Sequence, residues 1–468
     1  MTFSSPVFLF VFFPLVCVCY FLIPAKFLRG RNALLTAASL IFYGFGEPGA
    51  MLLMLGVVLW SWVCALMMKK SSTCRRLFLP LGVIGDLAVL GVWKYADFLI
   101  DSVNALFGVT APLLHLRLPI GISFFVFQAV SYLMDVSRGE AEAQHSYFKL
   151  LLYISFFPQL IAGPIVRYQT VAEALNARRS TPEDVSAGIR RMIWGLSKKL
   201  LIADTVGQIA DTVFAASASA SMPLAWLGAV CYTLQIYYDF SGYSDMAVGM
   251  GQLFGFRFPE NFDHPYCSAS ITEFWRRWHI SLTTWFRQYL YIPLGGNRKG
   301  SVRTVLNKWI VFLCTGLWHG ASWNFVIWGA VNGALMTLEQ PFRKKGKPEK
   351  RHWYGHIYTV LAVVCAFVIF RADTLTQAGQ MYRAMFAGEL LSLKAAAPAV
   401  RLLSPLVITV LLAACIGSSP LPLKLAERAK KQYACTEAVL SVITLGLLLL
   451  CMMSAAATTY HPFIYFRF

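Results

Sequence analysis

Long apolar runs separated by clusters of Lys and Arg dominate this sequence. Of its 468 residues, 57% are hydrophobic and only 14% are charged, whereas an ordinary soluble domain carries about 25% charged residues. Runs such as Met51 to Met68 approach the ~20 apolar residues that a helix needs to cross a bilayer. The pattern therefore predicts an all-α polytopic membrane protein, a helical bundle with about 10 to 12 membrane segments, some of them interfacial or re-entrant.

The formal net charge of +18 comes from basic residues that lie between the apolar runs, for example at positions 26–31 and 69–76. Cytoplasmic loops of membrane proteins are enriched in Lys and Arg in this way. Because no RNA- or DNA-binding module is visible, we attribute the charge to topology and lipid headgroups and expect no nucleic-acid partner. The first apolar run, 6–24, has no Lys or Arg before it, so we interpret it as a retained span and not as a cleaved signal peptide.

A single integral-membrane domain is expected to occupy residues 1–468, because no long polar segment is present. Aromatic and basic residues alternate in 257–303, which predicts a cytoplasmic interfacial or re-entrant helix ending at the Gly-Gly-Asn turn of 295–297. The basic segment 343–351 is expected in the cytoplasm. Residues 457–468 are expected to form a C-terminal tail at the outer face.

His319 lies in the stretch GLWHGASWNFVIW, inside an apolar run from about Trp309 to Leu338. This run is long enough to span, with a break expected at Gly316 and Gly320. An ionisable residue within a span is costly and is often functional. A hydrogen bond across a helix interface would also explain the imidazole, and its position alone does not separate the two interpretations.

His319 would suit general base catalysis, because imidazole is the commonest side chain for that task near neutral pH. No serine-nucleophile elbow, H-E-x-x-H motif or phosphate-binding loop accompanies it. A base without its own nucleophile indicates that an incoming hydroxyl attacks a bound donor. The eleven cysteines include no C-x-x-C pair, so we predict no metal site.

Four further residues are candidates for orienting a histidine or lining a tunnel. Asp239 and Asp245, in YYDFSGYSD, would orient a histidine or hold an acceptor, although they would equally satisfy the neighbouring tyrosines. Trp318 and Asn324 flank His319 in the sequence.

A basic cluster within 257–303 would bind the phosphates of a donor, since Arg and Lys are the usual phosphate-binding side chains. The candidates are Arg276, Arg277, Arg298 and Lys299. Topology and headgroup contacts are the alternative explanation for this cluster. His279 also lies in this stretch, in a Trp-rich environment like that of His319.

Five ordered stretches together resemble the membrane-bound O-acyltransferase (MBOAT) family, in its bacterial branch of alginate- and peptidoglycan-type O-acetylation. They are LPIGISFFVFQAVSYLMDV, FFPQLIAGPIVRY, LQIYYDFSGYSDMAVGMGQLFGFRFPENF, ITEFWRRWHISLTTWFRQYLYIPLGGNR and GLWHGASWNFVIWGAVNG. The resemblance extends from about residue 6 to the C-terminus. It implies a helical bundle around a central tunnel, with His319 as the catalytic histidine and His279 as the second characteristic histidine.

The C-terminal FIYFRF matches an F-x-Y-x-x-F pattern of this acyl-export group, and the resemblance implies that Tyr465 acts as an acyl relay. An aromatic belt at the outer interface is the alternative. We therefore expect an O-acetyltransferase of the bacterial inner membrane. Acetyl-CoA would be its donor substrate, with no permanently bound cofactor.

The expected partners are a periplasmic or extracellular SGNH-type transferase, the cytosolic acyl donor and membrane lipids, and the acceptor would be an exported or cell-envelope polysaccharide. Two alternatives remain. One is D-alanyl transfer to teichoic acid from the phosphopantetheine thioester of a carrier protein. The other is a non-catalytic channel or flippase for an acylated carrier.

Overall fold

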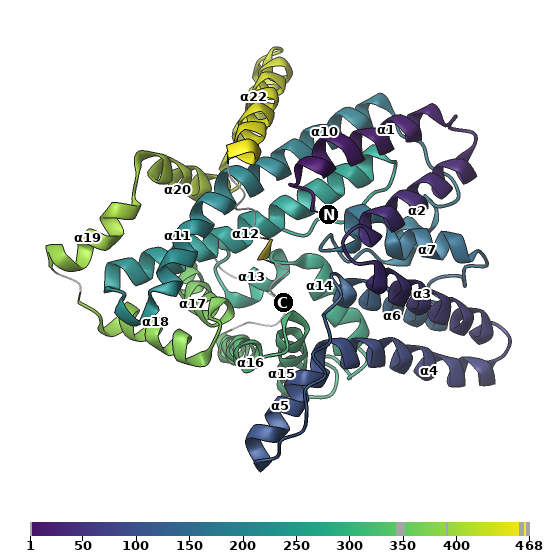
Figure 1. Cartoon of the computed structure of the whole chain (residues 1–468), viewed down its shortest axis with the longest axis horizontal. Helices are drawn as coiled ribbons and strands as arrows, with labels where there is room; N and C mark the ends of the chain where they lie inside the picture. The colour runs from purple at the N-terminus through teal and green to yellow at the C-terminus, as the bar shows by residue number, and fades with distance from the viewer. Residues whose placement is uncertain (1, 343–351, 390–391, 458–462, 465–468) are drawn as a thin grey trace. The chain divides into compact units, whose positions relative to one another are not determined.

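The computed structural model describes residues 2–342, 352–389, 392–457 and 463–464 (Figure 1). Every regular element in these ranges is helical, which confirms the predicted all-α class. The chain forms two compact units, one made of 1–192 and 243–260 and the other of 193–242 and 261–468. The basic loop 343–351 and Tyr465 lie outside the described residues. The assignment of residues 1–468 to one membrane domain stays a prediction.

The first unit is built on helices α3, α4 and α6, which pack against one another (Figure 1). Helix α3 begins with Pro48, whose fixed φ suits a first helical position. Helix α4 is capped by Ser71, whose hydroxyl accepts a hydrogen bond of 3.1 Å from the backbone N–H of Cys74. The hydroxyl of Ser61 donates to the buried carboxyl group of Asp86 at 2.9 Å and links α3 to α4. The helices of this unit are α1 (Phe13–Leu22), α2 (Leu28–Gly44), α3 (Pro48–Met68), α4 (Ser72–Leu90), α5 (Ala96–Phe107), α6 (Ile122–Arg138), α7 (Tyr147–Ser155), α8 (Phe157–Leu160) and α9 (Tyr168–Ala172).

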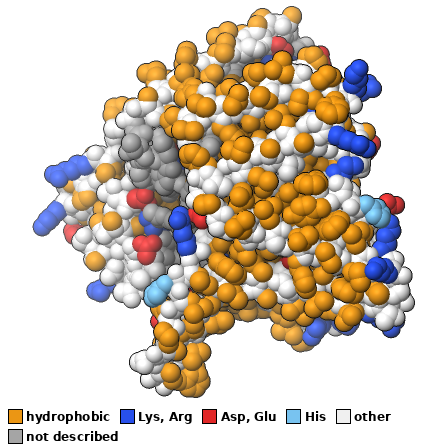
Figure 2. All heavy atoms as spheres, turned by 45° about the vertical axis from the view of Figure 1, so that its right-hand side comes forward, with side chains coloured by type: hydrophobic (Ala, Val, Ile, Leu, Met, Phe, Trp, Pro, Cys, Tyr) orange, Lys and Arg blue, Asp and Glu red, His pale blue; other side chains and the backbone are white. Residues whose placement is uncertain are grey.

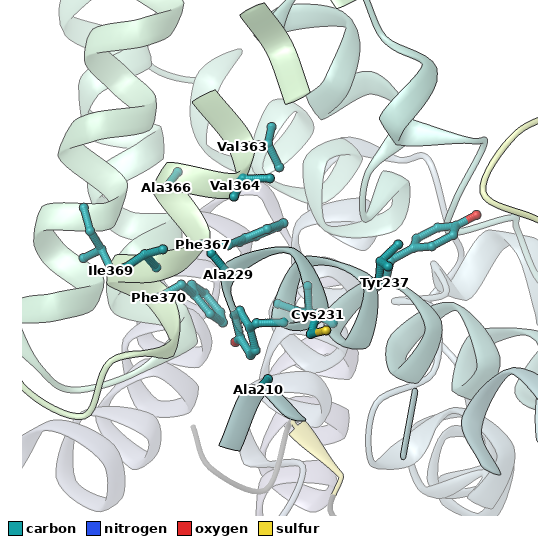
Figure 3. Close-up of a cluster of buried hydrophobic side chains, with 14 of the residues drawn as sticks. Ala210, Ala229, Cys231, Tyr237, Val363, Val364, Ala366, Phe367, Ile369 and Phe370 are labelled. Atoms are coloured by element: carbon teal, nitrogen blue, oxygen red, sulfur yellow. The ribbon is translucent and has the colours of Figure 1, made fainter. Parts of the chain in front are cut away.

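The second unit has a core of aromatic and aliphatic side chains from α11, α12 and α17 (Figure 3). Phe367 and Phe370 of α17 lie in this core together with Ala229 and Cys231 of α12. Helices α10 (Pro182–Ser197) and α12 (Met222–Leu253) each contribute residues to both units. The other helices are α11 (Asp204–Ala215), α13 (Ile271–Arg277), α14 (Ile280–Phe286), α15 (Ser301–His319), α16 (Trp323–Leu338), α17 (Trp353–Arg371), α18 (Leu375–Ala387), α19 (Leu393–Leu402), α20 (Pro405–Gly417), α21 (Leu421–Gln432) and α22 (Thr436–Ala457).

Within the residues that the structure describes, four helical segments are long and apolar enough to cross a bilayer, namely Pro48–Met68, Ser72–Phe107, Trp353–Arg371 and Thr436–Ala457. The pair Lys394–Leu402 and Pro405–Gly417, bent by 80°, would make a fifth span. Figure 2 shows hydrophobic side chains over a broad face of the molecule, with Lys and Arg along its edge. So wide an apolar surface is suited to lipid. The protein is a multi-pass membrane protein, and the count of about 10 to 12 membrane segments stays a prediction because shorter and broken helices fail this length test.

The apolar run that contains His319 is not one helix but two, α15 and α16, which lie side by side (Figure 1). The break comes directly after His319, where Gly320 has an extended backbone. Gly316 of α15 lies against the carbonyl oxygen of Phe325, and Gly329 of α16 lies against that of Phe312. A side chain at either glycine would collide with backbone, so these residues allow the two helices to approach closely.

The interfacial helix predicted within 257–303 is divided into two short helices, α13 and α14. Ser270 caps α13 by accepting a hydrogen bond of 3.1 Å from the N–H of Glu273. The division falls at His279, whose φ of 44° belongs to the left-handed region. That conformation is unusual for a residue with a side chain and is often found at functional sites. The chain then turns at Gly295 and Gly296, as the sequence predicts.

Replacing Gly316 with alanine should destabilise the protein, because the added methyl group would push against the carbonyl oxygen of Phe325. Overpacking of this kind costs about 1–3 kcal/mol. The thermal unfolding midpoint in detergent, followed by tryptophan fluorescence, should therefore fall. Gly333→Ala is the matched control, since a methyl group there would meet the Trp309 ring at an ordinary 3.4 Å. Equal midpoints for the two variants would contradict the close approach.

Candidate active site

His319 ends α15 inside a box of aromatic rings. The centroid of its imidazole lies 4.9 Å from that of Trp318, 5.2 Å from that of Trp328 and 5.0 Å from that of Phe370. The residue is only 4% exposed. Helices α15, α16 and α17 each supply one wall of this box. Close packing of rings around an imidazole excludes water and holds the imidazole in one orientation.

His279 is buried at the start of α14, and its polar partner is Asn261. The Nδ1 atom of the imidazole lies 3.1 Å from Oδ1 of Asn261. The same oxygen accepts hydrogen bonds from the backbone N–H of Ser281 at 3.2 Å and from its hydroxyl at 2.9 Å. Since Oδ1 serves as an acceptor, Nδ1 of His279 must carry the proton and Nε2 the lone pair. Burial lowers the pKa of His279 to about 3, so the ring is neutral at pH 7.

The two histidines lie forty residues apart in the sequence. In the structure, both contact the ring of Trp318. The Trp318 ring centroid is 5.8 Å from that of His279 and 4.9 Å from that of His319. Phe240 of α12 contacts His279 from another direction, at 4.6 Å. Two sequence-predicted candidates and the predicted Trp318 are thus brought into one cluster.

Asp239 belongs to a buried cluster of charges close to Phe240 in the sequence. Its carboxylate lies 2.9 Å from Nζ of Lys199, and Nζ is also 2.7 Å from the carboxylate of Asp204. The second oxygen of Asp239 accepts a hydrogen bond of 2.8 Å from the backbone N–H of Ile464, in the C-terminal segment. Asp239 therefore holds the C-terminal segment, and Lys199 compensates the buried negative charge.

A cavity of about 260 Å³ opens beside the aromatic box. Phe370 and Ile464 contribute to its apolar wall, and Gln235, Asp211 and Arg371 to its polar wall. Gly320, Ala321 and Ser322, the three residues that follow His319, line it as well. A guanidinium nitrogen of Arg371 lies 2.6 Å from the carboxylate of Asp211. The cavity thus combines polar groups with a wall that His319 shares through Phe370.

Other predicted residues lie away from these groups or in other contacts. Asp245 belongs to the first unit, where its carboxylate pairs with Arg191 at 2.8 Å. Arg191 also pairs with Glu260, so Asp245 belongs to a network of ion pairs in this unit. Asn324 lies at the start of α16 and donates a hydrogen bond of 2.6 Å to the carbonyl oxygen of Ala372, which ties α16 to the end of α17.

The four donor-phosphate candidates do not share one environment. Arg276, Arg298 and Lys299 are exposed. Arg277 is half-buried, and its guanidinium lies 3.0 Å from the carboxylate of Glu273, one turn away on α13. Three of the four cations therefore remain accessible to a ligand in solution.

Comparison with known proteins decides the family. The model of the family "MBOAT, membrane-bound O-acyltransferase family" matches residues 50–372, which include both histidines of the cluster. The chain belongs to the membrane-bound O-acyltransferase family. It is 41% identical over 491 aligned residues to the probable alginate O-acetylase AlgI of Pseudomonas putida, covering 100% of both chains.

Two more distant relatives extend the comparison of this acyltransferase. The peptidoglycan O-acetyltransferase of Helicobacter pylori is 34% identical, over 82% of this chain and 79% of the relative. The teichoic acid D-alanyltransferase of Bacillus subtilis is 30% identical, over 53% of this chain and 65% of the relative.

Sequence reasoning missed five polar residues of the acyltransferase that lie in or beside the site. Lys199 and Arg371 each end or flank an apolar run, where a cation is ordinarily assigned to topology. Asn261, Asp211 and Gln235 carry no motif. Their partners are remote in the sequence, as Asp211 and Arg371 are separated by 160 residues. No local signal in the sequence would have found these pairs.

Replacing Asn261 with leucine should lower activity, because the proton on Nδ1 of His279 would lose its acceptor and the ring its fixed orientation. Loss of a residue that positions another typically costs about 10- to 100-fold, by analogy with groups that orient metal-ligating histidines. The measurement is the rate of acyl transfer by membranes containing equal amounts of each variant. Ser281→Ala is the control, since it removes one hydroxyl from Oδ1 but leaves the imidazole contact. Equal activities for Asn261→Leu and Ser281→Ala would contradict this role of Asn261.

Proposed function

We propose that this acyltransferase takes an acetyl group from a cytosolic thioester and delivers it outward for O-acetylation of an exported or cell-envelope polysaccharide. The bacterial inner membrane is the proposed location. The observation that carries the proposal is the imidazole of His319, buried in an aromatic box beside a polar cavity. The names of the Pseudomonas putida and Helicobacter pylori relatives support acetyl as the acyl group.

His319 acts as the general base in this proposal. It accepts the proton of an attacking hydroxyl while the hydroxyl oxygen forms a bond to the thioester carbonyl carbon. The carbon–sulfur bond then breaks, and the leaving thiolate takes the proton from His319. The aromatic box keeps water away from the reacting carbonyl, which would otherwise hydrolyse the thioester.

His279 has a different role, because its tautomer is fixed. With Nδ1 protonated toward Asn261, Nε2 offers a lone pair. A neutral ring in this position would hydrogen-bond the acyl donor and orient that donor next to Trp318. The ring carries no net charge into the reaction. Its contribution is therefore positioning, and proton transfer falls to His319.

The donor's phosphates would meet the exposed cations Arg276, Arg298 and Lys299. Acetyl-CoA is the proposed donor, and its phosphates suit such a cluster. The similarity to the Bacillus subtilis D-alanyltransferase supports a second candidate, in which the thioester is that of a carrier protein. Free thiol released from acetyl-CoA by the purified protein favours the first donor, and release only from a loaded carrier protein favours the second.

Tyr465 is the proposed relay for the acyl group. Its neighbour Ile464 donates a backbone hydrogen bond to Asp239 and lines the cavity beside the aromatic box. A phenol ionises near pH 10, far more readily than a sugar alcohol. Phenolate is therefore the better leaving group, and an acyl group on Tyr465 is easily passed on. An SGNH-type transferase on the outer side would then move the acyl group from Tyr465 to the polymer.

Replacing His319 with alanine should reduce acyl transfer by about 10²- to 10⁴-fold, the usual contribution of a general base. The measurement is thiol release from the donor, at equal amounts of protein inserted in the membrane. His145→Ala is the matched control, because His145 lies in a polar loop, where its Nε2 is 3.1 Å from Nζ of Lys69. A His319→Ala variant with near wild-type thiol release would refute both the base and the enzyme mechanism, and would leave a channel or flippase.

Replacing Tyr465 with phenylalanine should abolish O-acetylation of the polymer while the protein still inserts and binds donor, because only the hydroxyl is lost. Mass spectrometry of the C-terminal peptide, from cells without the outer transferase, should find an acetyl adduct on Tyr465 in the parent protein. Phe463→Leu is the control, since it changes a neighbouring aromatic residue and leaves the phenol. Normal acetylation of the polymer by the Tyr465→Phe variant would contradict the relay role of Tyr465.

A further inference from the structure

Arg371 is held rigidly in the polar wall of the cavity. It is 7% exposed, and its guanidinium lies over the ring of Phe214 at 5.0 Å and over that of Tyr232 at 5.9 Å. One nitrogen, Nη2, is 2.6 Å from the carboxylate of Asp211. Another, Nη1, is 3.6 Å from the carboxylate of Asp373, which is beyond hydrogen-bond distance. The aromatic contacts and the ion pair fix the plane of the guanidinium.

Two groups in this wall have hydrogen-bonding capacity that the described part of the chain does not use. The Nε and Nη1 atoms of Arg371 are buried donors without an acceptor there, and Oε1 of Gln235 is a buried acceptor without a donor. The amide of Gln235, which is 5% exposed, packs against Gly207 and is fixed in place. It is costly to leave buried donors and acceptors unpaired, so these atoms of Arg371 and Gln235 indicate a bound ligand.

The charge of the wall restricts what the ligand can be. The buried ion pair with Asp211 already compensates the charge of the Arg371 guanidinium, and the carboxylate of Asp373 lies only 3.6 Å away, so an anion would gain little there. A hydroxyl group is neutral, accepts a hydrogen bond and donates another. It would satisfy an N–H of Arg371 and Oε1 of Gln235 together, which a carbonyl or an ether oxygen cannot do.

The position of the cavity relates this ligand to the base. Its lining includes Gly320, the residue after His319, and Phe370, whose ring centroid lies 5.0 Å from that of the His319 imidazole. Ile464 lines the same cavity. A hydroxyl bound here would lie in a cavity that shares the Phe370 ring with the environment of His319.

We infer that Gln235 and Arg371 form the binding site for the hydroxyl group of the acyl acceptor. The ligand is a neutral alcohol, supplied either by a phenol or by a sugar. This inference rests on the proposed function, since it assigns the acceptor site of that reaction. Gln235 and Arg371 bind the hydroxyl, and they do not take its proton.

Photolabelling of the full-length chain tests the site. The probe is a phenol that carries a diazirine, used with the Tyr465→Ala variant so that the chain's own phenol does not compete. Mass spectrometry should locate the adducts on peptides that line the cavity. Gln235→Met should weaken the labelling about tenfold, because it removes the acceptor of a buried hydrogen bond at similar volume. Thr233→Val is the matched control, because the Thr233 hydroxyl donates a hydrogen bond of 2.8 Å within α12, to the carbonyl oxygen of Ala229.

A second probe makes the test independent of any cavity variant. The methyl ether of the same phenol keeps the ring and the diazirine but cannot donate a hydrogen bond to Gln235, so it should label the cavity about tenfold less well. Equal labelling by phenol and ether, unchanged labelling in Gln235→Met, or adducts confined to other peptides would overturn the inference and leave a cavity filled by water.

Competition identifies the source of the hydroxyl. Protection by N-acetyltyrosine amide supports a phenol as the acceptor, and protection by methyl mannoside supports a sugar. Neither the labelling nor the competition requires a donor or turnover. Specific labelling combined with normal thiol release by His319→Ala would therefore retain the site and reject the proposed mechanism, so the two failures are distinguishable.

Discussion

The close approach of α15 and α16 at Gly316 and Gly329 determines where His319 lies. Each glycine faces a backbone carbonyl of the other helix, so the pair packs backbone against backbone. The chain must then reverse within three residues, Gly320 to Ser322, and this reversal leaves His319 at the end of a helix instead of in its middle. Trp328 of α16 reaches the imidazole only because the two helices are this close. The geometry around His319 thus depends on two residues that have no side chain.

Buried charge is the second constraint on this unit. A carboxylate removed from water is costly unless a partner compensates it. Asp239 shares Lys199 with Asp204, and Arg371 pairs with Asp211. Both groups join elements that are remote in the sequence, and the first also binds the C-terminal segment through Ile464. An apolar residue would fill the same space at lower cost, so these ions are better explained by the segment and the cavity that they position.

The sequence predicted what depends on local pattern. The apolar runs indicated the all-α membrane class, and the Trp-rich surroundings singled out His279 and His319. Of the two glycines at which a break was expected, Gly320 directly follows α15, whereas Gly316 lies within that helix. It did not predict what depends on remote contacts. Asp239 and Asp245 occur six residues apart in one motif, yet they pair with Lys199 and Arg191 in different units. One interfacial helix was expected where α13 and α14 are separated at His279, because a left-handed histidine leaves no signature in the sequence.

An acyltransferase in which His319 is the general base, as proposed, must favour its acceptor over water. The contrast between the aromatic box and the polar wall of the cavity would serve this purpose. The rings of the aromatic box pack closely around the imidazole and leave little room for water there, whereas the polar wall of the cavity would hold water whenever the acceptor is absent. A hydroxyl bound by Gln235 and Arg371, as proposed above, would displace that water. Binding of the acceptor would then also remove the water that could hydrolyse the thioester. The selectivity would then arise from the contrast between close aromatic packing and a polar wall, since imidazole itself does not distinguish the proton of water from that of an alcohol.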